Sequence, residues 1–259
     1  MQRPKSSRNQ SIVFLEDSTF ISPLDKAAID QLEASIRHNG TRYEVGLLLK
    51  VNRPKLPDNR EFASRLFYSL ERRLLSSSEL RKAVTDSIED NLFNGHAVKV
   101  SSTPLQAPVW FLPYHPVRHP RKPEKIRLVY NAATRYNGVA INDVLLKGPD
   151  LTTQLLAVML RFCERRIGVT ADISKMFYQV LDREGDRPMF RFLWRSPGSA
   201  ERLQEYEMTV HIFGAVSSPT VCSFALQRLI KDAPEHLKEV AKRILSSFYV
   251  DNFLASFDN

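Results

Sequence analysis

Two aspartates end short β-rich runs, and carboxylates in that position could hold a divalent cation. Asp172 closes the run that starts at Ile167. Asp251 lies in FYVDNFLASF, two apolar runs joined by a Val-Asp-Asn tip that predicts a tight β-hairpin. An acid that closes a strand and an acid on a neighbouring turn can meet at one edge of a sheet. Mg²⁺ is usually bound by one or two carboxylates plus substrate phosphates, and paired ions stabilise the attacking and leaving oxygens of phosphoryl transfer. Taken alone, each Asp is more often a turn former or a helix cap.

Mixed helices and strands are predicted to position these acids. Apolar residues at helical spacing, with Ser or Ser-Pro starts and an Asn-Gly stop, predict helices at residues 24–38, around 66–74, after 76–78 to about 91, and at 151–164, 220–232 and 234–246. Strands are predicted at residues 109–117, 125–131, 167–171, 189–194 and 205–211, with a basic, Pro-rich loop at 118–125 and a short turn or helix at 174–179. Such a mixture with antiparallel neighbours indicates an α+β fold.

Composition narrows the class of protein. The chain has 259 residues, 43% of them hydrophobic, and a formal net charge of +8. A basic excess suits phosphate-bearing partners such as nucleic acid or an anionic membrane, although a merely basic surface explains it equally well. The two cysteines, Cys163 and Cys222, exclude a disulfide framework and suit a reducing compartment, cytoplasmic or nuclear. No run approaches 18 apolar residues and Ile12–Leu15 is too short for a signal sequence, so we expect a soluble intracellular protein.

Several motifs in order resemble the polymerase region of BEL/Pao-type retrotransposon polyproteins. The most specific are ADISKMFYQV, RFLWR, FGAVSSP and FYVDN, and the resemblance is collinear over about residues 17–257. It implies a right-hand polymerase fold, with fingers and a partial palm built from an antiparallel sheet and packed helices. We therefore expect a lead-in segment at residues 1–60, a fingers-like region at 61–150 and a partial palm-like region at 151–259. The implied activity is RNA-directed DNA polymerisation, a nucleotidyl transfer.

The resemblance also implies roles at the two acids. Asp172 matches the first metal-binding aspartate of the family. Asp251 matches the first aspartate of its tyrosine-x-Asp-Asp signature, preceded by Tyr249 and Val250. Two Mg²⁺ or Mn²⁺ ions are expected in an intact family member. Phe177 resembles the aromatic gate that packs under the incoming sugar, and plain core packing is the alternative for that residue.

Further matches concern the nucleotide and the template. Lys125 and Arg127 match the fingers strand that grips the triphosphate, whereas without the resemblance both are ordinary solvated charges. Three residues, Gly214, Ser218 and Pro219, match the turn and helix start that abut the template; a capped helix with an early Pro describes them equally. The implied partners are an RNA or DNA template–primer and deoxynucleotides. His211 is expected to pack in the core.

The chain departs from the family where Asn252 replaces the second aspartate of the signature. An amide offers a carbonyl oxygen but no negative charge, so we expect the reaction rate to fall by orders of magnitude. Asn131, where relatives often have Asp, is expected to matter less. A thumb, RNase H and integrase would follow in an intact element. The 259 residues stop after the hairpin, so the thumb is expected to be absent, apolar palm surface uncovered, and Asn252→Asp alone unable to restore full activity.

Two other interpretations stay open from the sequence. One is a non-catalytic nucleic-acid-binding protein that reuses the basic polymerase groove. The other is a remnant of a retrotransposon polyprotein with no selected function. Primer extension with Mg²⁺ or Mn²⁺ separates the enzyme from both, and salt-sensitive binding without extension supports the binding protein.

Overall fold

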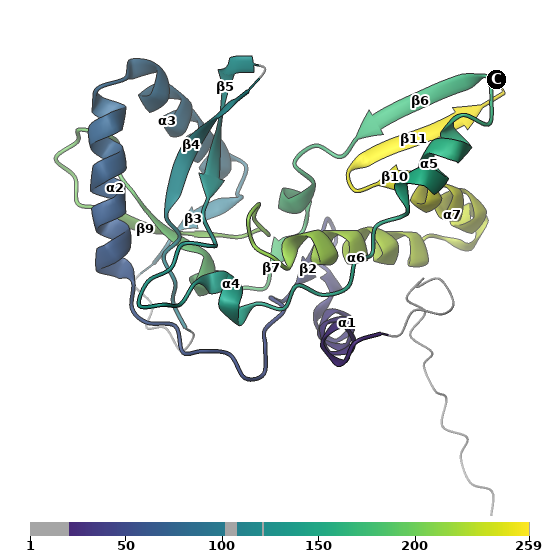
Figure 1. The fold of residues 1–259 in the computed structure, drawn as a ribbon, viewed down its shortest axis with the longest axis horizontal. Helices are drawn as coiled ribbons and strands as arrows, with labels where there is room; N and C mark the ends of the chain where they lie inside the picture. The colour runs from purple at the N-terminus through teal and green to yellow at the C-terminus, as the bar shows by residue number, and fades with distance from the viewer. Residues whose placement is uncertain (1–20, 102–107, 121, 259) are drawn as a thin grey trace, which may run out of the picture.

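The computed structural model describes residues 21–101, 108–120 and 122–258 (Figure 1). Seven α-helices lie in these residues: α1 Pro23–Ser35, α2 Arg60–Leu75, α3 Ser78–Phe93, α4 Ile141–Val144, α5 Leu155–Phe162, α6 Ser218–Lys231 and α7 Lys238–Ser246. Short 3-10 helices are η1 Met176–Gln179, η2 Arg187–Phe190 and η3 Glu235–Leu237. No helix in the described ranges is both long and apolar enough to cross a bilayer.

The strands form four small sheets within the described residues. Their bounds are β1 Arg37–His38, β2 Tyr43–Val45, β3 Ala97–Lys99, β4 Tyr114–His119, β5 Lys122–Tyr130, β6 Ile167–Asp172, β7 Leu181–Asp182, β8 Arg191–Trp194, β9 Gln204–Met208, β10 Phe248–Tyr249 and β11 Asn252–Phe257. The strand orders are β1-β2-β7, β10-β11-β6, β3-β9-β8 and β4-β5. All pairs are antiparallel except β2 with β7. This mixture is the α+β class that the sequence predicts.

Local sequence signals account for the start of α1 and for both ends of α3. The Ser22 and Ser77 side chains accept hydrogen bonds from the backbone N–H groups of Asp25 and Leu80, and so cap α1 and α3. Asn94 caps the end of α3, and Gly95 follows at φ +67°. The apolar face of α2 is buried as predicted, apart from Leu66, which is 37% exposed.

The predicted strand at 109–117 and loop at 118–125 are partly wrong. Strand β4 starts only at Tyr114, because Trp110 and Leu112 exchange single backbone hydrogen bonds with Pro188 and Arg191 instead of joining a ladder. Strand β5 already starts at Lys122, so most of the expected loop belongs to a hairpin. Helix α5 is also shorter than the predicted 151–164 segment.

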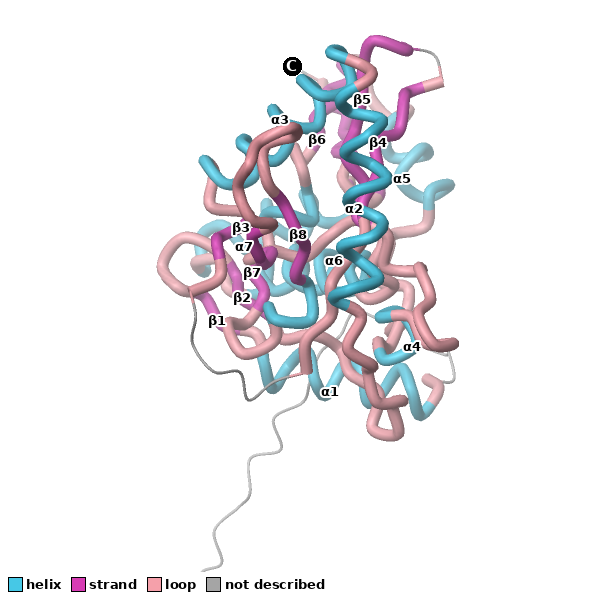
Figure 2. The backbone as a smooth tube through the Cα atoms, turned by 90° about the vertical axis from the view of Figure 1, so that its left-hand side faces the viewer, coloured by secondary structure: helices cyan, strands magenta, loops and turns pink. Residues whose placement is uncertain are grey.

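Two large hydrophobic clusters, with a small third one at Ala63, Phe111 and Leu193, hold the described chain together. The first surrounds Trp110 and Phe192 and draws buried residues from α2, α3, β8 and β9, on both sides of residue 150. Helix α2 lies along β8 at one edge of it (Figure 2). The second cluster packs α1 against α6 through Leu32, Val221 and Phe224. Figure 1 shows α6 running from the first cluster toward the β10-β11-β6 sheet, which lies at the far end of the molecule.

Candidate metal and nucleic-acid site

The register of the β10-β11-β6 sheet brings the predicted acids to one end of that sheet. Asp172, the last residue of β6, lies directly opposite Asn252, the first residue of β11. The Tyr249–Asn252 pair closes a two-residue turn made of Val250 and Asp251. The Ile173 backbone N–H donates to the Asp251 carbonyl at 2.9 Å. Asp172, Asp251 and Asn252 are therefore neighbours, and the hairpin tip is one residue shorter than the predicted Val-Asp-Asn tip.

The turn holds its first residue in a strained conformation. Val250 has φ +58°, which is rare for a β-branched residue and costs about 1–3 kcal/mol. The half-buried Val250 side chain packs against the second hydrophobic cluster, and the two flanking ladders fix the backbone on either side. Strain of this kind persists where the surroundings fix the chain. The consequence here is that the Asp251 carboxylate is set beside the end of β6.

The donors at this corner are two carboxylates and one amide. Asp172 is exposed and Asp251 half-buried. The Asn252 Nδ2 donates to Asp251 Oδ1 at 2.8 Å, and directly opposed residues of an antiparallel pair share a face, so the amide stands beside Asp172. No group of three His, Cys, Asp or Glu side chains able to hold a metal occurs in the described part of the chain. Two carboxylates are enough to bind one Mg²⁺ ion whose remaining ligands are phosphate oxygens, and they suit one ion better than a pair of ions.

Phe177 lies just beyond Asp172, in η1. Its ring contacts the Phe213 ring at a centroid distance of 4.4 Å, and it also packs on the second cluster. Phe213 is 50% exposed, so the two rings form an aromatic surface that reaches solvent. Lys175, in the left-handed region at φ +49°, pairs with Asp90 of α3 and so ties this turn to the first cluster. Core packing therefore holds for Phe177, and its gate role stays a prediction.

Gly214 occupies a position that other residues could enter only with strain. It has φ +103°, and a Cβ there would lie 2.9 Å from the Tyr130 carbonyl oxygen. The Asn142 side chain spans this turn: its Nδ2 donates to the Gly214 carbonyl at 3.0 Å, and its Oδ1 accepts from the Val216 N–H at 3.0 Å. Asn142 is not predicted from the sequence, because nothing local connects it to a turn that far along the chain.

The other predicted contacts are less closely grouped. Ser218 and Pro219 begin α6, but the Ser218 side chain is fully buried, which leaves only Pro219 exposed there. Arg127 is exposed on β5, opposite Val117 of β4, in a different sheet from Asp172 (Figure 1). Lys125 belongs to β5, and its side chain lies outside the described residues.

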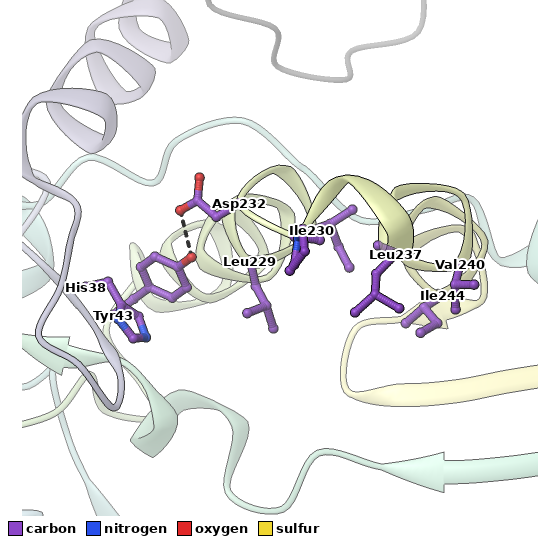
Figure 3. Close-up of a pocket in the computed structure, with 11 residues that line it drawn as sticks. His38, Tyr43, Leu229, Ile230, Asp232, Leu237, Val240 and Ile244 are labelled. Atoms are coloured by element: carbon purple, nitrogen blue, oxygen red, sulfur yellow. Dashed lines mark hydrogen bonds between the residues drawn. The ribbon is translucent and has the colours of Figure 1, made fainter.

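An apolar cavity of about 550 Å³ lies away from the acids, between α6, α7 and the β1–β2 turn (Figure 3). Its lining includes Leu229, Leu237, Val240 and Ile244. Its main polar feature is the Tyr43 hydroxyl, which donates to Asp232 at 2.9 Å. Burial, and then Asp232, raise the pKa of Tyr43 to about 12. The apolar lining does not suit a phosphate.

Three solved structures of foamy viral protease–reverse transcriptases have a similar fold. The structure in complex with dsDNA gives a TM-score of 0.54 at 15% identity and covers 93% of this chain and 47% of that chain. The structure in complex with an RNA/DNA hybrid gives a TM-score of 0.51 at 14% identity and covers 93% of this chain and 30% of that chain. The structure of the prototype foamy virus CSH mutant gives a TM-score of 0.52 at 15% identity, and it also covers 93% of this chain and 30% of that chain. This chain thus spans less than half the length of each. No protein-family model and no curated protein matches the sequence.

Proposed function

We propose that this chain is the fingers and partial palm of a retroelement reverse transcriptase of the BEL/Pao type, which uses an RNA or DNA template–primer and deoxynucleotides. The observation that carries the proposal is the β6–β11 register, which sets Asp172 beside the Asp251 turn. The reverse transcriptase-like fold supports it, and so do the motifs that the sequence shares with that family. Two of the similar structures are complexes with nucleic acid, one with dsDNA and one with an RNA/DNA hybrid, which favours a nucleic-acid partner here.

In this proposal Asp172 and Asp251 hold Mg²⁺ against the phosphates of the nucleotide. The bound ion would supply Lewis-acid stabilisation of the phosphoryl oxygens. Phe177 and Phe213 form an aromatic floor for the sugar, on which a 2′-hydroxyl would be crowded. Arg127 and Lys125 contribute positive charge from the fingers hairpin, and Gly214 and Pro219 border the template. Thumb, RNase H and integrase segments would belong to the rest of the polyprotein.

Asn252 makes this copy a weak polymerase. Its amide bonds to Asp251 where a second carboxylate would add negative charge, so the corner binds divalent ions less tightly than an intact signature. That same bond favours a second candidate function, a nucleic-acid-binding domain without turnover. Both candidates draw on the net positive charge of the chain, and they differ in whether a bound primer is extended.

The metal assignment is tested by titrating Mn²⁺ into matched Asp→Asn variants. We expect Asp172→Asn and Asp251→Asn each to weaken binding by about tenfold or more, because each removes half of the charge at the corner. Asp30→Asn makes the same chemical change on the exposed face of α1 and should leave the titration unaltered. Unchanged Mn²⁺ affinity in Asp172→Asn would overturn the assignment.

Primer extension then separates the two candidate functions. The wild-type chain and Asn252→Asp are compared with a labelled template–primer, in Mg²⁺ and in Mn²⁺, over a range of salt. Salt-sensitive binding with slow extension that Asn252→Asp accelerates supports the polymerase. Binding that neither protein converts into extension supports the binding domain, and no binding at any salt contradicts both.

A further inference from the structure

Asp182 and His211 meet inside the protein with no access to solvent. Both side chains are 0% exposed, and His211 Nε2 lies 3.1 Å from Asp182 Oδ1. No described residue gives either Asp182 carboxyl oxygen a well-aligned hydrogen bond. Neither ring nitrogen of His211 has a well-aligned hydrogen bond either, so two unsatisfied polar groups face each other at 3.1 Å. A buried polar group without a partner is costly, which favours a hydrogen bond between these two side chains. The sequence analysis expected His211 to pack and did not single out Asp182.

The backbone explains why these two side chains meet. Leu181 and Val210 form an antiparallel bridge. On either side of it, the Asp182 N–H donates to the Thr209 carbonyl at 2.8 Å and the His211 N–H donates to the Val180 carbonyl at 3.1 Å. The pairing therefore fixes both chain segments, and their side chains turn to the same buried side.

The same two segments carry the aromatic floor. Phe177 lies in η1, immediately before β7, and Phe213 comes two residues after His211. The Asp182–His211 contact thus joins the ends of the two segments whose rings touch at 4.4 Å. The pair is therefore placed where it can influence how Phe213 lies against Phe177.

Both groups are held in their neutral forms. Burial raises the pKa of Asp182 well above its usual value; Asp186 and Glu44 raise it further, and Arg187 opposes them. Burial lowers the pKa of His211 to about 4. The Val45 carbonyl has the smaller, opposite effect, because it favours the charged ring. Cys222 of α6 also interacts with Asp182, and burial, followed by Asp182, raises the pKa of its thiol. Besides the N–H of the neutral imidazole, the pair then holds one titratable proton, on the Asp182 carboxyl group. That O–H can donate to imidazole Nε2.

We infer that Asp182 and His211 are positioning residues: a neutral carboxylic acid–imidazole pair that shares one proton and sets Phe213 against Phe177, and so fixes the shape of the surface under the nucleotide sugar. The inference rests on the proposed function for its last step. Neither residue touches the nucleotide in this arrangement. Their effect passes through the two rings.

The test compares three variants by NMR. In the wild type we expect the His211 side-chain nitrogens to show a neutral ring from pH 5.5 to 8 (about one unit or more above its low pKa). We also expect nuclear Overhauser contacts between the Phe177 and Phe213 rings. The double variant Asp182→Leu/His211→Leu fills the same space without hydrogen bonding, and should fold but lose those contacts. Asp182→Asn should retain them, because its amide N–H can donate to Nε2. His236→Gln, at an exposed histidine, is the control.

Two results would overturn the inference: an imidazolium signal from His211 at pH 7, or ring contacts unchanged in the double-leucine variant. Nucleotide preference gives the functional readout. The double-leucine variant should lower discrimination between deoxy- and ribonucleotides by about tenfold, and Asp182→Asn should retain the wild-type discrimination. If the wild type extends no primer while its NMR contacts respond as expected, the positioning pair stands and the polymerase function fails.

Discussion

The first hydrophobic cluster and the β10-β11-β6 sheet hold their strands in different ways. Every residue of β8 is buried, with Phe192 inaccessible to solvent between Tyr130 and Tyr206. Every residue of β6 is exposed, and in β11 only Ala255 and Ser256 are buried. Burial therefore fixes the first region. The second depends on its six-pair ladder and on the turn at Val250. The acids of the proposed site lie in the sheet whose geometry is fixed by strand pairing and by the Val250 turn.

This difference shows where a substitution should act. A change in the first cluster alters how much protein is folded and leaves the geometry of the acids as it was. A change in the sheet alters which residues face each other at Asp172, at small cost in total stability. Stability and site geometry are thus carried by separate parts of the chain, and three predictions test that separation.

The largest expected effect is that of a large-to-small change in the first cluster. Phe192→Ala should lower the free energy of unfolding by about 3–5 kcal/mol, because it leaves a cavity among packed rings. Val169→Ala on β6, where the side chain is 40% exposed, should cost about 1 kcal/mol or less. Urea unfolding followed by circular dichroism measures both. Equal losses would break the comparison, since the sheet would then be held by burial as well.

Gly214 tests how closely a turn approaches the first cluster, at Tyr130. Gly214→Ala should cost about 1–3 kcal/mol, from its φ of +103° and from a Cβ that would lie 2.9 Å from the Tyr130 carbonyl oxygen. Gly40→Ala is a matched control, with φ +100° and nothing within 4 Å of the added atom. The difference in unfolding free energy between the two variants isolates the close approach. If Gly40→Ala costs as much, backbone strain alone explains the effect.

The third prediction concerns pH and the Asp182–His211 pair. The unfolded chain carries one proton on His between about pH 4 and 6.5, and the folded chain carries one on Asp182, so the pair adds no slope there. Above pH 6.5 and below the raised pKa of Asp182, the folded chain holds one proton more than the unfolded chain, whose His is then neutral. Stability should then fall as pH rises, by up to about 1.4 kcal/mol per pH unit.

Urea unfolding at pH 6, 7 and 8 measures that slope. The Asp182→Leu/His211→Leu variant lacks both groups, so the wild-type slope minus the variant slope is the contribution of the pair. A wild type that gains stability relative to this variant between pH 6.5 and 8 would contradict the prediction. Because the pair lies far from the exposed sheet, Val169→Ala should leave the slope unchanged.

The sequence predicts the parts of this structure that depend on near neighbours. The caps at Ser22 and Ser77, the stop at Gly95 and the hairpin around Asp251 are all set within a few residues. Their placement needed no knowledge of the rest of the chain. The same locality explains why Asp172 could be expected at a strand end.

Features that join distant segments were missed or wrong. Asn142 at Gly214 and Asp182 at His211 depend on pairings across the fold that no local pattern reports. Residues 109–113 look like a strand by composition, but their partners around residues 188–191 supply only isolated bonds. The roles of Phe177 and Arg127 stay predictions, because they concern a ligand and not the chain itself.

Asn252 lies directly opposite Asp172, and this pairing lets the hairpin fold without a bound cation. Two carboxylates directly opposite each other would repel, by about 0.2–1 kcal/mol across an antiparallel pair. Asn252→Asp would therefore make the corner dependent on a cation, with a melting temperature that rises as Mg²⁺ is added. With the amide at position 252, we expect the hairpin to fold equally well in the presence of a chelator. The same amide weakens the binding of the divalent ion.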